Sequence, residues 1–255
     1  NIKYVNDNVV CESCIKGKQH RLSFGTRNVT AEKPGDLVHA DLCGPIEEDS
    51  FSGYRYFLCF KDDFTKYRSI YFLKTKSEAV DKLKVFLAEA RTQGHTVKEL
   101  RTDGGGEFDN VQFRSVTQQS GILHRMTMPF TPEQNGTAER ENRTLVEAAR
   151  TMLQSTSLTK KLWAEAVNTA TYVLNHTAIT RVSGKAPYEL WLNRTISFDH
   201  LRVFGTHCYV HIPKQKRKKF DAKGTKGCFV GYCGVRETVT GSTSPNSTRL
   251  FSVAM

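Results

Sequence analysis

The chain has 255 residues and a mean hydropathy of -0.46, with 38% hydrophobic and 25% charged residues, which suffices for a packed core and excludes a disordered chain. Its 37 Lys and Arg against 26 Asp and Glu leave a net charge of +11, which favours a polyanionic partner such as nucleic acid or an anionic surface. The longest apolar run, around residues 56–60, is far shorter than the roughly 20 residues of a membrane span, so we expect no membrane partner.

The cysteines and the first residues indicate the setting of the chain. No secretory signal is present, and the first residue is Asn1 rather than Met, so we expect a piece cut from a longer product. The seven cysteines are odd in number and lack the spacing of a secreted disulfide framework, which predicts a reducing, intracellular location. Only Cys11 and Cys14 have the spacing of metal ligands.

From Asp36 onward the pattern predicts a mixed α/β domain. Asp62 and Asp63 indicate a hairpin turn, Ser77 is the expected N-cap of the first helix, and Gly94 is expected to end it. The three first strands suit an antiparallel arrangement and the later ones a parallel arrangement. We expect strands at 37–42, 54–60, 67–73, 97–102 and 122–126, helices at 77–93, 108–120, 139–153 and 161–176, and a loop at 129–132.

A second, smaller unit is expected after a boundary marked by Pro187 and residues 193–198. Short strands are predicted at 201–204, 208–212 and 227–232, with a strongly basic segment at 214–219 between the last two. This pattern is typical of a small β-rich module.

Three carboxylates occupy positions that suit a metal site. Asp41 ends the first strand, and Asp103 ends the fourth and precedes three glycines. Glu139 begins a helix, and 35 residues lie between it and Asp103. Strand ends of one sheet can bring two acids together, and a nearby helix can add a third. Oxygen ligands suit Mg²⁺, and two such ions about 4 Å apart can promote phosphoryl transfer. Taken singly, each acid also fits a surface or capping role.

Four segments carry a family resemblance when they are taken in order. They are residues 39–45 (HADLCGP), 60–67, 101–108 (RTDGGGEF) and 131–140 (TPEQNGTAER). Together they resemble the integrase of copia-type long-terminal-repeat retrotransposons, a D,D-35-E polynucleotidyl transferase. The resemblance extends to about residue 235.

The resemblance implies a ribonuclease-H-like core, a mixed sheet flanked by helices, over residues 34–197. It implies an SH3-like β module over 198–255 and a partial zinc-binding module over 1–30. Asp41, Asp103 and Glu139 match the catalytic triad, which in this family holds two Mg²⁺ or Mn²⁺ ions. The implied reaction is 3′-end processing and strand transfer of element DNA into target DNA, in which water or a DNA 3′-OH is the nucleophile. The family also implies a homo-oligomer that travels from a cytoplasmic particle to the nucleus.

Candidate DNA contacts follow from the same positions. Gln134 and Asn135 match the flexible loop before the catalytic helix, although Asn-Gly also suits a plain turn. Arg140 and Arg143 lie beside Glu139, where Arg143 is either a phosphate contact or the partner of a solvated ion pair with Glu139. The basic segment adds Lys214, Lys216, Arg217, Lys218 and Lys219, which otherwise form a solvated hairpin loop.

The ends of the chain depart from the family. Cys11 and Cys14 resemble the second half of its His-His-Cys-Cys zinc module, but no His lies in residues 1–10, so we expect Zn²⁺ only if upstream ligands are supplied. After Gly234 the match fades, which indicates truncation or a frameshift.

Three further acids lie near these motifs, and two other functions also fit the sequence. Asp62 and Asp63 are expected to shape their turn, and Glu107 to flank Asp103. The rivals are a nuclease of the same fold that hydrolyses without joining, and a decayed or domesticated copy that binds DNA without catalysis.

Overall fold

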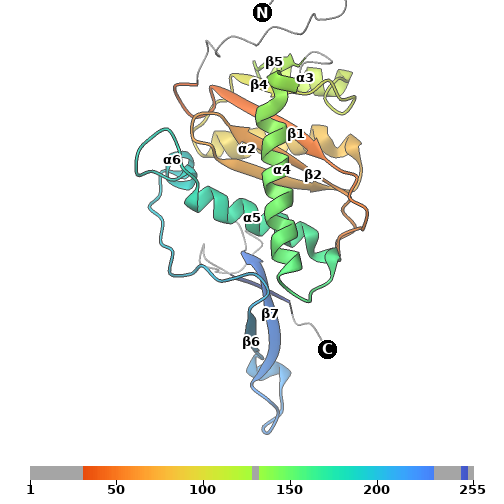
Figure 1. The fold of residues 1–255 in the computed structure, drawn as a ribbon, viewed down its shortest axis with the longest axis vertical. Coiled ribbons are helices and arrows are strands. Elements are labelled where there is room, and N and C mark those ends of the chain that lie inside the picture. Colours follow the sequence, from red (N-terminus) through yellow and green to blue (C-terminus); the bar gives the residue numbers. More distant parts are fainter. Residues whose placement is uncertain (1–30, 128–131, 233–247, 252–255) are drawn as a thin grey trace, which may run out of the picture.

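A five-stranded mixed sheet forms the centre of the molecule (Figure 1). The computed structural model describes residues 31–127, 132–232 and 248–251, so the expected zinc module and the segment after Tyr232 up to residue 247 lie outside the described residues. The strand order is β3-β2-β1-β4-β5, which confirms the predicted mixed α/β class. The strands are β1 (Leu37–Cys43), β2 (Tyr56–Asp62), β3 (Arg68–Leu73), β4 (Glu99–Thr102) and β5 (Leu123–Met126).

The first three strands are antiparallel, and the predicted turn between β2 and β3 is built by Asp62. The Asp62 carboxylate accepts hydrogen bonds from the N–H and hydroxyl of Thr65, both at 2.7 Å, and from the Gly35 N–H at 2.8 Å. Such side-chain bonds to nearby backbone N–H groups are the usual reason for Asp in a turn. Asp62 is therefore occupied structurally, as the sequence indicates.

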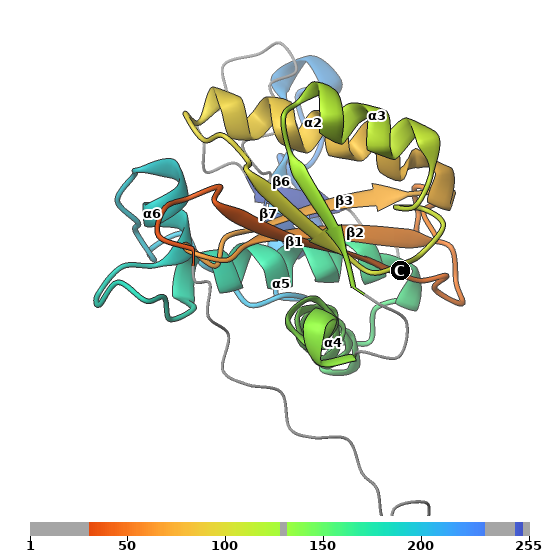
Figure 2. The same cartoon turned by 90° about the horizontal axis from the view of Figure 1, so that it is seen from above.

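Strands β4 and β5 are parallel to β1, and helices cover both faces of the sheet (Figure 2). Helices α2 (Ala79–Thr92) and α3 (Val111–Gln119) lie on one face, and α4 (Pro132–Gln154) and α5 (Trp163–Thr177) lie on the other. The alternation of side chains along β2 explains the two cores: Leu58 and Phe60 are buried on the α2 side, and Phe57 and Cys59 on the α5 side. No helix in the described ranges combines the length and the apolar character that a bilayer crossing requires.

Several helix boundaries differ from the predicted ones. Ser77 is not an N-cap, since a 3₁₀ turn (Lys76–Glu78) precedes α2 and Thr75 flanks it, donating its N–H to the Glu78 carboxylate. Helix α4 begins at Pro132 and not at Glu139 as predicted. Its first turns could not be recognised in the sequence, because residues 132–138 carry no apolar stripe. Pro187, expected to mark a boundary, is instead the first residue of α6 (Pro187–Leu192), a position that tolerates its missing N–H.

The C-terminal strands form a second, three-stranded antiparallel sheet in the order β6-β7-β8. Its strands are β6 (His207–His211), β7 (Gly224–Tyr232) and β8 (Thr248–Phe251); the strand predicted at 201–204 is absent from the structure. Strand β7 packs on α5, where the Thr169 hydroxyl donates to the Val230 carbonyl at 3.3 Å. A side chain at Gly231, whose φ is +149°, would approach that hydroxyl to 2.9 Å. A glycine at this position therefore permits close packing.

Helix α5 is attached to the sheet edge through Asn175, which suggests a stability test. Its side chain accepts from the Arg68 N–H and donates to the Arg68 carbonyl, both at 2.9 Å, so it takes the place of a neighbouring strand beside β3. We expect Asn175→Ala to lower the free energy of unfolding by about 1–3 kcal/mol, because two buried backbone groups lose their partner. Urea unfolding measures this. Thr177→Ala, at an exposed position of the same helix, is the control, and equal losses in the two variants would contradict the prediction.

Candidate active site

Asp41 and Asp103 are brought together by two neighbouring parallel strands. Strand β1 pairs with β4 in a register that sets His39 beside Arg101, and the same register continued places Asp41 beside Asp103. Both carboxylates are half-buried. The strand ends thus juxtapose two of the three acids singled out from the sequence.

Asp41 is held by two hydrogen bonds and lies in a negative environment. One carboxylate oxygen accepts from the Leu42 N–H at 3.1 Å, and the other accepts from the side-chain amide of Asn142 at 2.9 Å. Burial, and then the negative charges of Asp103 and Glu139, raise the pKa of Asp41 from 3.8 to about 7, and the two hydrogen bonds offset only part of this rise. Asp103 and Glu139 are therefore near enough to Asp41 to affect its pKa.

Gly105, the second of the three glycines after β4, makes room for side chains at the site. Asp103 accepts from the Gly105 N–H at 3.1 Å. A side chain at Gly105 would lie 2.8 Å from the Glu107 carboxyl carbon and 3.1 Å from Asp103, so this glycine allows the two acids to approach each other. Glu107 in turn forms an ion pair with Lys76 at 3.4 Å.

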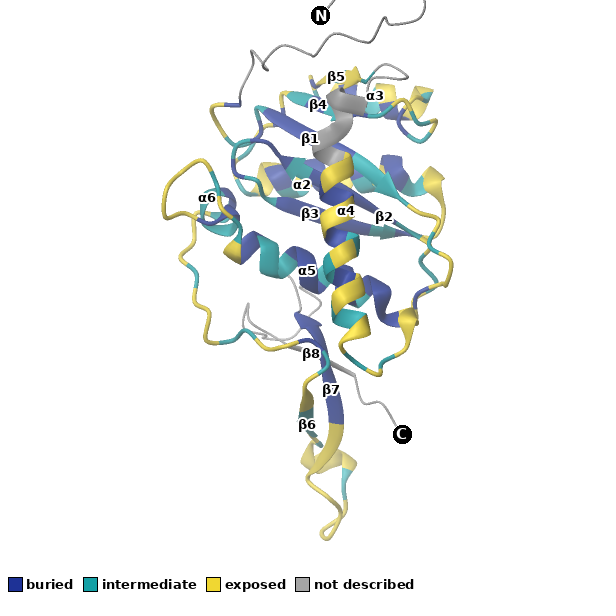
Figure 3. Ribbon diagram, viewed as in Figure 1, coloured by how far each residue is buried: buried dark blue, intermediate teal, exposed yellow. Residues whose placement is uncertain are grey.

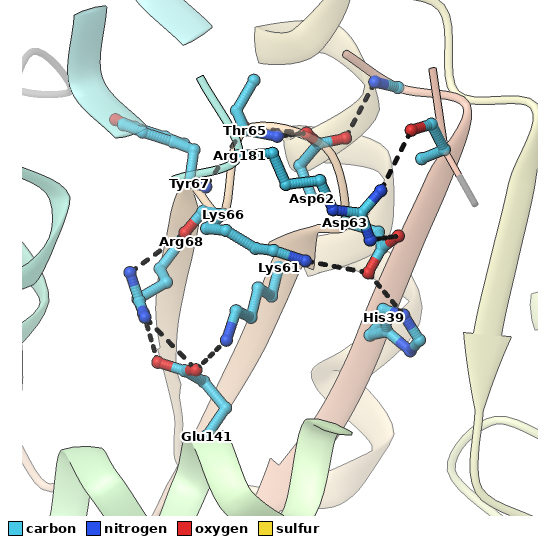
Figure 4. A network of polar contacts seen from close by, with 12 residues as sticks. His39, Lys61, Asp62, Asp63, Thr65, Lys66, Tyr67, Arg68, Glu141 and Arg181 are labelled. Carbon is cyan, nitrogen blue, oxygen red and sulfur yellow. Dashed lines mark hydrogen bonds and ion pairs between the residues drawn. The ribbon is translucent and has the colours of Figure 1, made fainter. Parts of the chain in front are cut away.

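Glu139 lies near the start of α4. Two residues that follow it, Glu141 and Asn142, anchor this helix to the sheet. Asn142 reaches Asp41, and Glu141 is paired with Lys61 of β2 and Arg68 of β3 (Figure 4). Neither Glu141 nor Asn142 stands out in the sequence as a site residue. One signal was available, since Asn142 follows Glu139 by three positions and therefore shares its side of a helix.

The carboxylates provide a suitable donor set for a hard divalent cation. Oxygen ligands are those that Mg²⁺ takes, and a cation would relieve the repulsion that raises the pKa of Asp41. Over residues 31–127, 132–232 and 248–251, however, no three His, Cys, Asp or Glu side chains converge closely enough to ligate one ion. The chemistry of the donors fits a metal, and Glu139 would have to approach the two aspartates to complete the site.

The predicted DNA contacts lie in two separate places. Arg140 and Arg143 are exposed on α4, and no ion pair between Glu139 and Arg143 is found among the described residues. Gln134 and Asn135 were expected in a loop but belong to α4, and their side chains lie outside the described residues.

The basic segment forms the end of the hairpin between β6 and β7. This hairpin and the outer face of α4 are largely exposed, and the hairpin lies at the end of the molecule opposite β4 and β5 (Figure 3). Its cations Lys214, Lys216, Lys218 and Lys219 are exposed, and Arg217 is half-buried and donates to the Ile212 carbonyl.

The raised pKa of Asp41 predicts a pH-dependent effect on stability. In the unfolded chain this carboxyl has its ordinary pKa of 3.8, so between about pH 4 and pH 7 the folded chain holds a proton that the unfolded chain has lost. Folding is then favoured by Asp41 at low pH, and this contribution is lost as the pH rises through 7. We expect Asp41→Asn to be more stable than the parent at pH 8 in the absence of metal, and the difference to shrink as the pH falls and to vanish at about pH 4. Urea unfolding at both pH values tests this, and a difference independent of pH would contradict it.

The chain matches two known protein families and several known proteins. Residues 31–132 match the integrase core domain family, and residues 206–237 match the retroviral polymerase SH3-like domain family. The chain is 41% identical over 223 residues to the retrovirus-related Pol polyprotein from transposon TNT 1-94 of Nicotiana tabacum. It is 34% identical over 225 residues to that from transposon RE2 of Arabidopsis thaliana. Each alignment covers 87% of this chain, but only 17% and 15% of the two polyproteins, so the chain spans a small part of the curated relatives it matches.

A solved structure has the same fold. The chain resembles a chain of the simian T-cell lymphotropic virus intasome, determined in complex with PP2A regulatory subunit B56 gamma, with a TM-score of 0.57 and 18% identity. The match covers 90% of this chain and 83% of that one.

Proposed function

Because the chain belongs to the copia-type retrotransposon integrases, with an integrase core domain followed by a retroviral SH3-like domain, we propose that it processes and joins DNA 3′ ends by metal-dependent phosphoryl transfer. The observation that carries this proposal is geometric: Asp41 on β1 lies beside Asp103, which directly follows β4, and Asn142 of α4, three residues after Glu139, donates to the Asp41 carboxylate at 2.9 Å. The rest of the proposal rests on the family.

Asp41 and Asp103 would hold the metal, and Glu139 would complete its ligands. A bound Mg²⁺ or Mn²⁺ pair would activate the attacking oxygen and stabilise the leaving oxygen. In end processing a water oxygen attacks phosphorus, and in joining a DNA 3′-OH oxygen attacks it. One P–O bond forms as the in-line P–O bond breaks, and the departing strand keeps a 3′-OH. Asn142 holds the Asp41 carboxylate from the α4 side and so limits its rotation.

The test is an assay on a labelled DNA duplex with Mn²⁺ or Mg²⁺, in which hydrolysis and strand joining give products of different length. We expect both products, and both should disappear when EDTA is added. Nicking without joining would favour the hydrolytic nuclease. DNA binding without either product would favour the copy that binds DNA without catalysis.

DNA binding by the basic hairpin has a measurable salt dependence. We expect replacement of Lys216, Lys218 and Lys219 by Gln to weaken binding and to reduce the slope of log K against log salt by about 0.9 for each phosphate that the hairpin no longer neutralises. Fluorescence anisotropy across a range of salt concentrations measures this slope. Lys84→Gln, at an exposed position of α2 on the opposite face of the sheet from α4, is the control. An unchanged slope in the triple variant would contradict the prediction.

The assembly state and location belong to the same proposal. We propose that copies of the chain act together on element ends and target DNA in the nucleus. Light scattering of the chain with and without DNA measures the assembly, and a monomer under both conditions would contradict it.

A further inference from the structure

One carboxylate and two cations form an ionic triad in the interior, on the side of the sheet that α4 covers. Glu141 of α4 accepts from Lys61 of β2 and from the guanidinium of Arg68 of β3 (Figure 4). The exposed fractions of these side chains are 5% for Glu141, 14% for Lys61 and 7% for Arg68. The triad, defined by these three residues, is therefore largely shielded from water.

The two cations of the triad depend on Glu141. Lys61 and Arg68 are direct cross-strand partners on β2 and β3, a placement in which like charges repel. The Glu141 carboxylate accepts from both cations and so compensates this repulsion. Because the triad is buried, sliding or rotating α4 would separate charges that have no water to replace their partner. The triad therefore favours one position of α4 on the sheet.

The triad holds α4 on the sheet next to the proposed catalytic residues. Between Glu139 and Thr144, the only buried side chains of α4 are Glu141 and Asn142; the first buried apolar side chain of the described part of the helix is Leu145. The buried contacts of α4 that lie nearest to Glu139 in sequence are thus polar. Cys59, directly opposite Asp41 on β2, is two residues from Lys61, so the triad and Asp41 share one face of the sheet.

We propose that Glu141, through its pairing with Lys61 and Arg68, is a positioning residue that determines how closely Glu139 approaches Asp41 and Asp103. Glu141 does not touch the reacting groups and acts through the placement of α4. This inference rests on the proposed function insofar as the three acids bind a metal.

The test replaces the whole triad, because a single substitution leaves unpaired buried charge and risks unfolding. In the variant Lys61→Met/Arg68→Met/Glu141→Met, apolar chains of similar length fill the same space without directional contacts. Circular dichroism and thermal unfolding establish that it folds. Its affinity for Mn²⁺ without DNA is then measured by calorimetry, and its joining rate is measured on the labelled duplex. Glu147→Gln, at an exposed position of α4, is the control.

We expect the folded triple variant to bind Mn²⁺ about 10–100-fold more weakly than the parent and to lose joining activity by a similar factor, as is typical when residues that orient ligands are removed. The control should match the parent. A folded triple variant whose Mn²⁺ affinity and joining rate are both within twofold of the parent would overturn the positioning role.

Failure of the proposed catalytic function can be distinguished from failure of the positioning role of Glu141. If the parent binds Mn²⁺ but neither nicks nor joins DNA, the catalytic proposal fails, and the Mn²⁺ affinities alone decide the positioning role. In that case a tenfold or greater loss in the triple variant supports the role, and equal affinities overturn it.

Discussion

Replacing Glu139 by Gln is expected to reduce nicking and joining by more than about 100-fold while leaving the fold intact. Removal of a residue that merely orients a metal ligand typically costs about 10–100-fold, so removal of a proposed ligand should cost more. The amide is close in shape to the carboxylate but lacks the negative charge that favours a divalent cation. Because Glu139 is exposed, the substitution should leave the free energy of unfolding within about 0.5 kcal/mol of the parent value.

The measurement is the yield of nicked and joined strands with Mn²⁺, together with urea unfolding of each variant. Asp103→Asn should behave like Glu139→Gln, since both remove a carboxylate that is proposed to hold the metal. The matched control is Glu147→Gln, which removes a carboxylate from an exposed position on the same helix. If Glu139→Gln retains the parent activity, the assignment of Glu139 is wrong, whatever the result for Asp103→Asn.

The second large effect concerns stability. Glu141→Gln is expected to lower the free energy of unfolding by about 3–5 kcal/mol, because it leaves Lys61 and Arg68 buried without a countercharge. The attraction to these two cations holds the pKa of the Glu141 carboxyl below its usual range although burial opposes this. At roughly 2–4 °C per kcal/mol for a domain of this size, the melting temperature should fall by about 6–20 °C.

Two comparisons separate this effect from a general loss of charge. Glu147→Gln should change the melting temperature by no more than about 2 °C, since its side chain is exposed. The triple methionine variant should recover most of the stability, because it removes the cations together with their partner. Thermal unfolding followed by circular dichroism measures all three variants, and a Glu141→Gln variant as stable as Glu147→Gln would show that the triad contributes little.

Much of the element order was predictable because hydrophobic periodicity is a local property. The apolar run of β2 and the helical spacing of Val80, Leu83 and Leu87 are visible in short stretches of sequence and correspond to buried residues in the fold. Gly94 was recognisable as the end of α2 for a similar reason, since its φ of +82° is one that glycine adopts readily. The first turns of α4 were not predictable, because residues 132–138 present no apolar stripe.

The sequence by itself determined the family, through four segments in a fixed order. It also indicated Asp41, Asp103 and Glu139 as the candidate metal-binding acids. Only the tertiary structure decided what surrounds them. Glu141 is separated from Lys61 by 80 positions and from Arg68 by 73, and charged residues are normally expected at the surface. Their burial follows from the pairing of β2 with β3 and the packing of α4 across them. Long-range contacts of this kind have no local pattern, so the anchoring of Glu139 emerges only when the chain is folded.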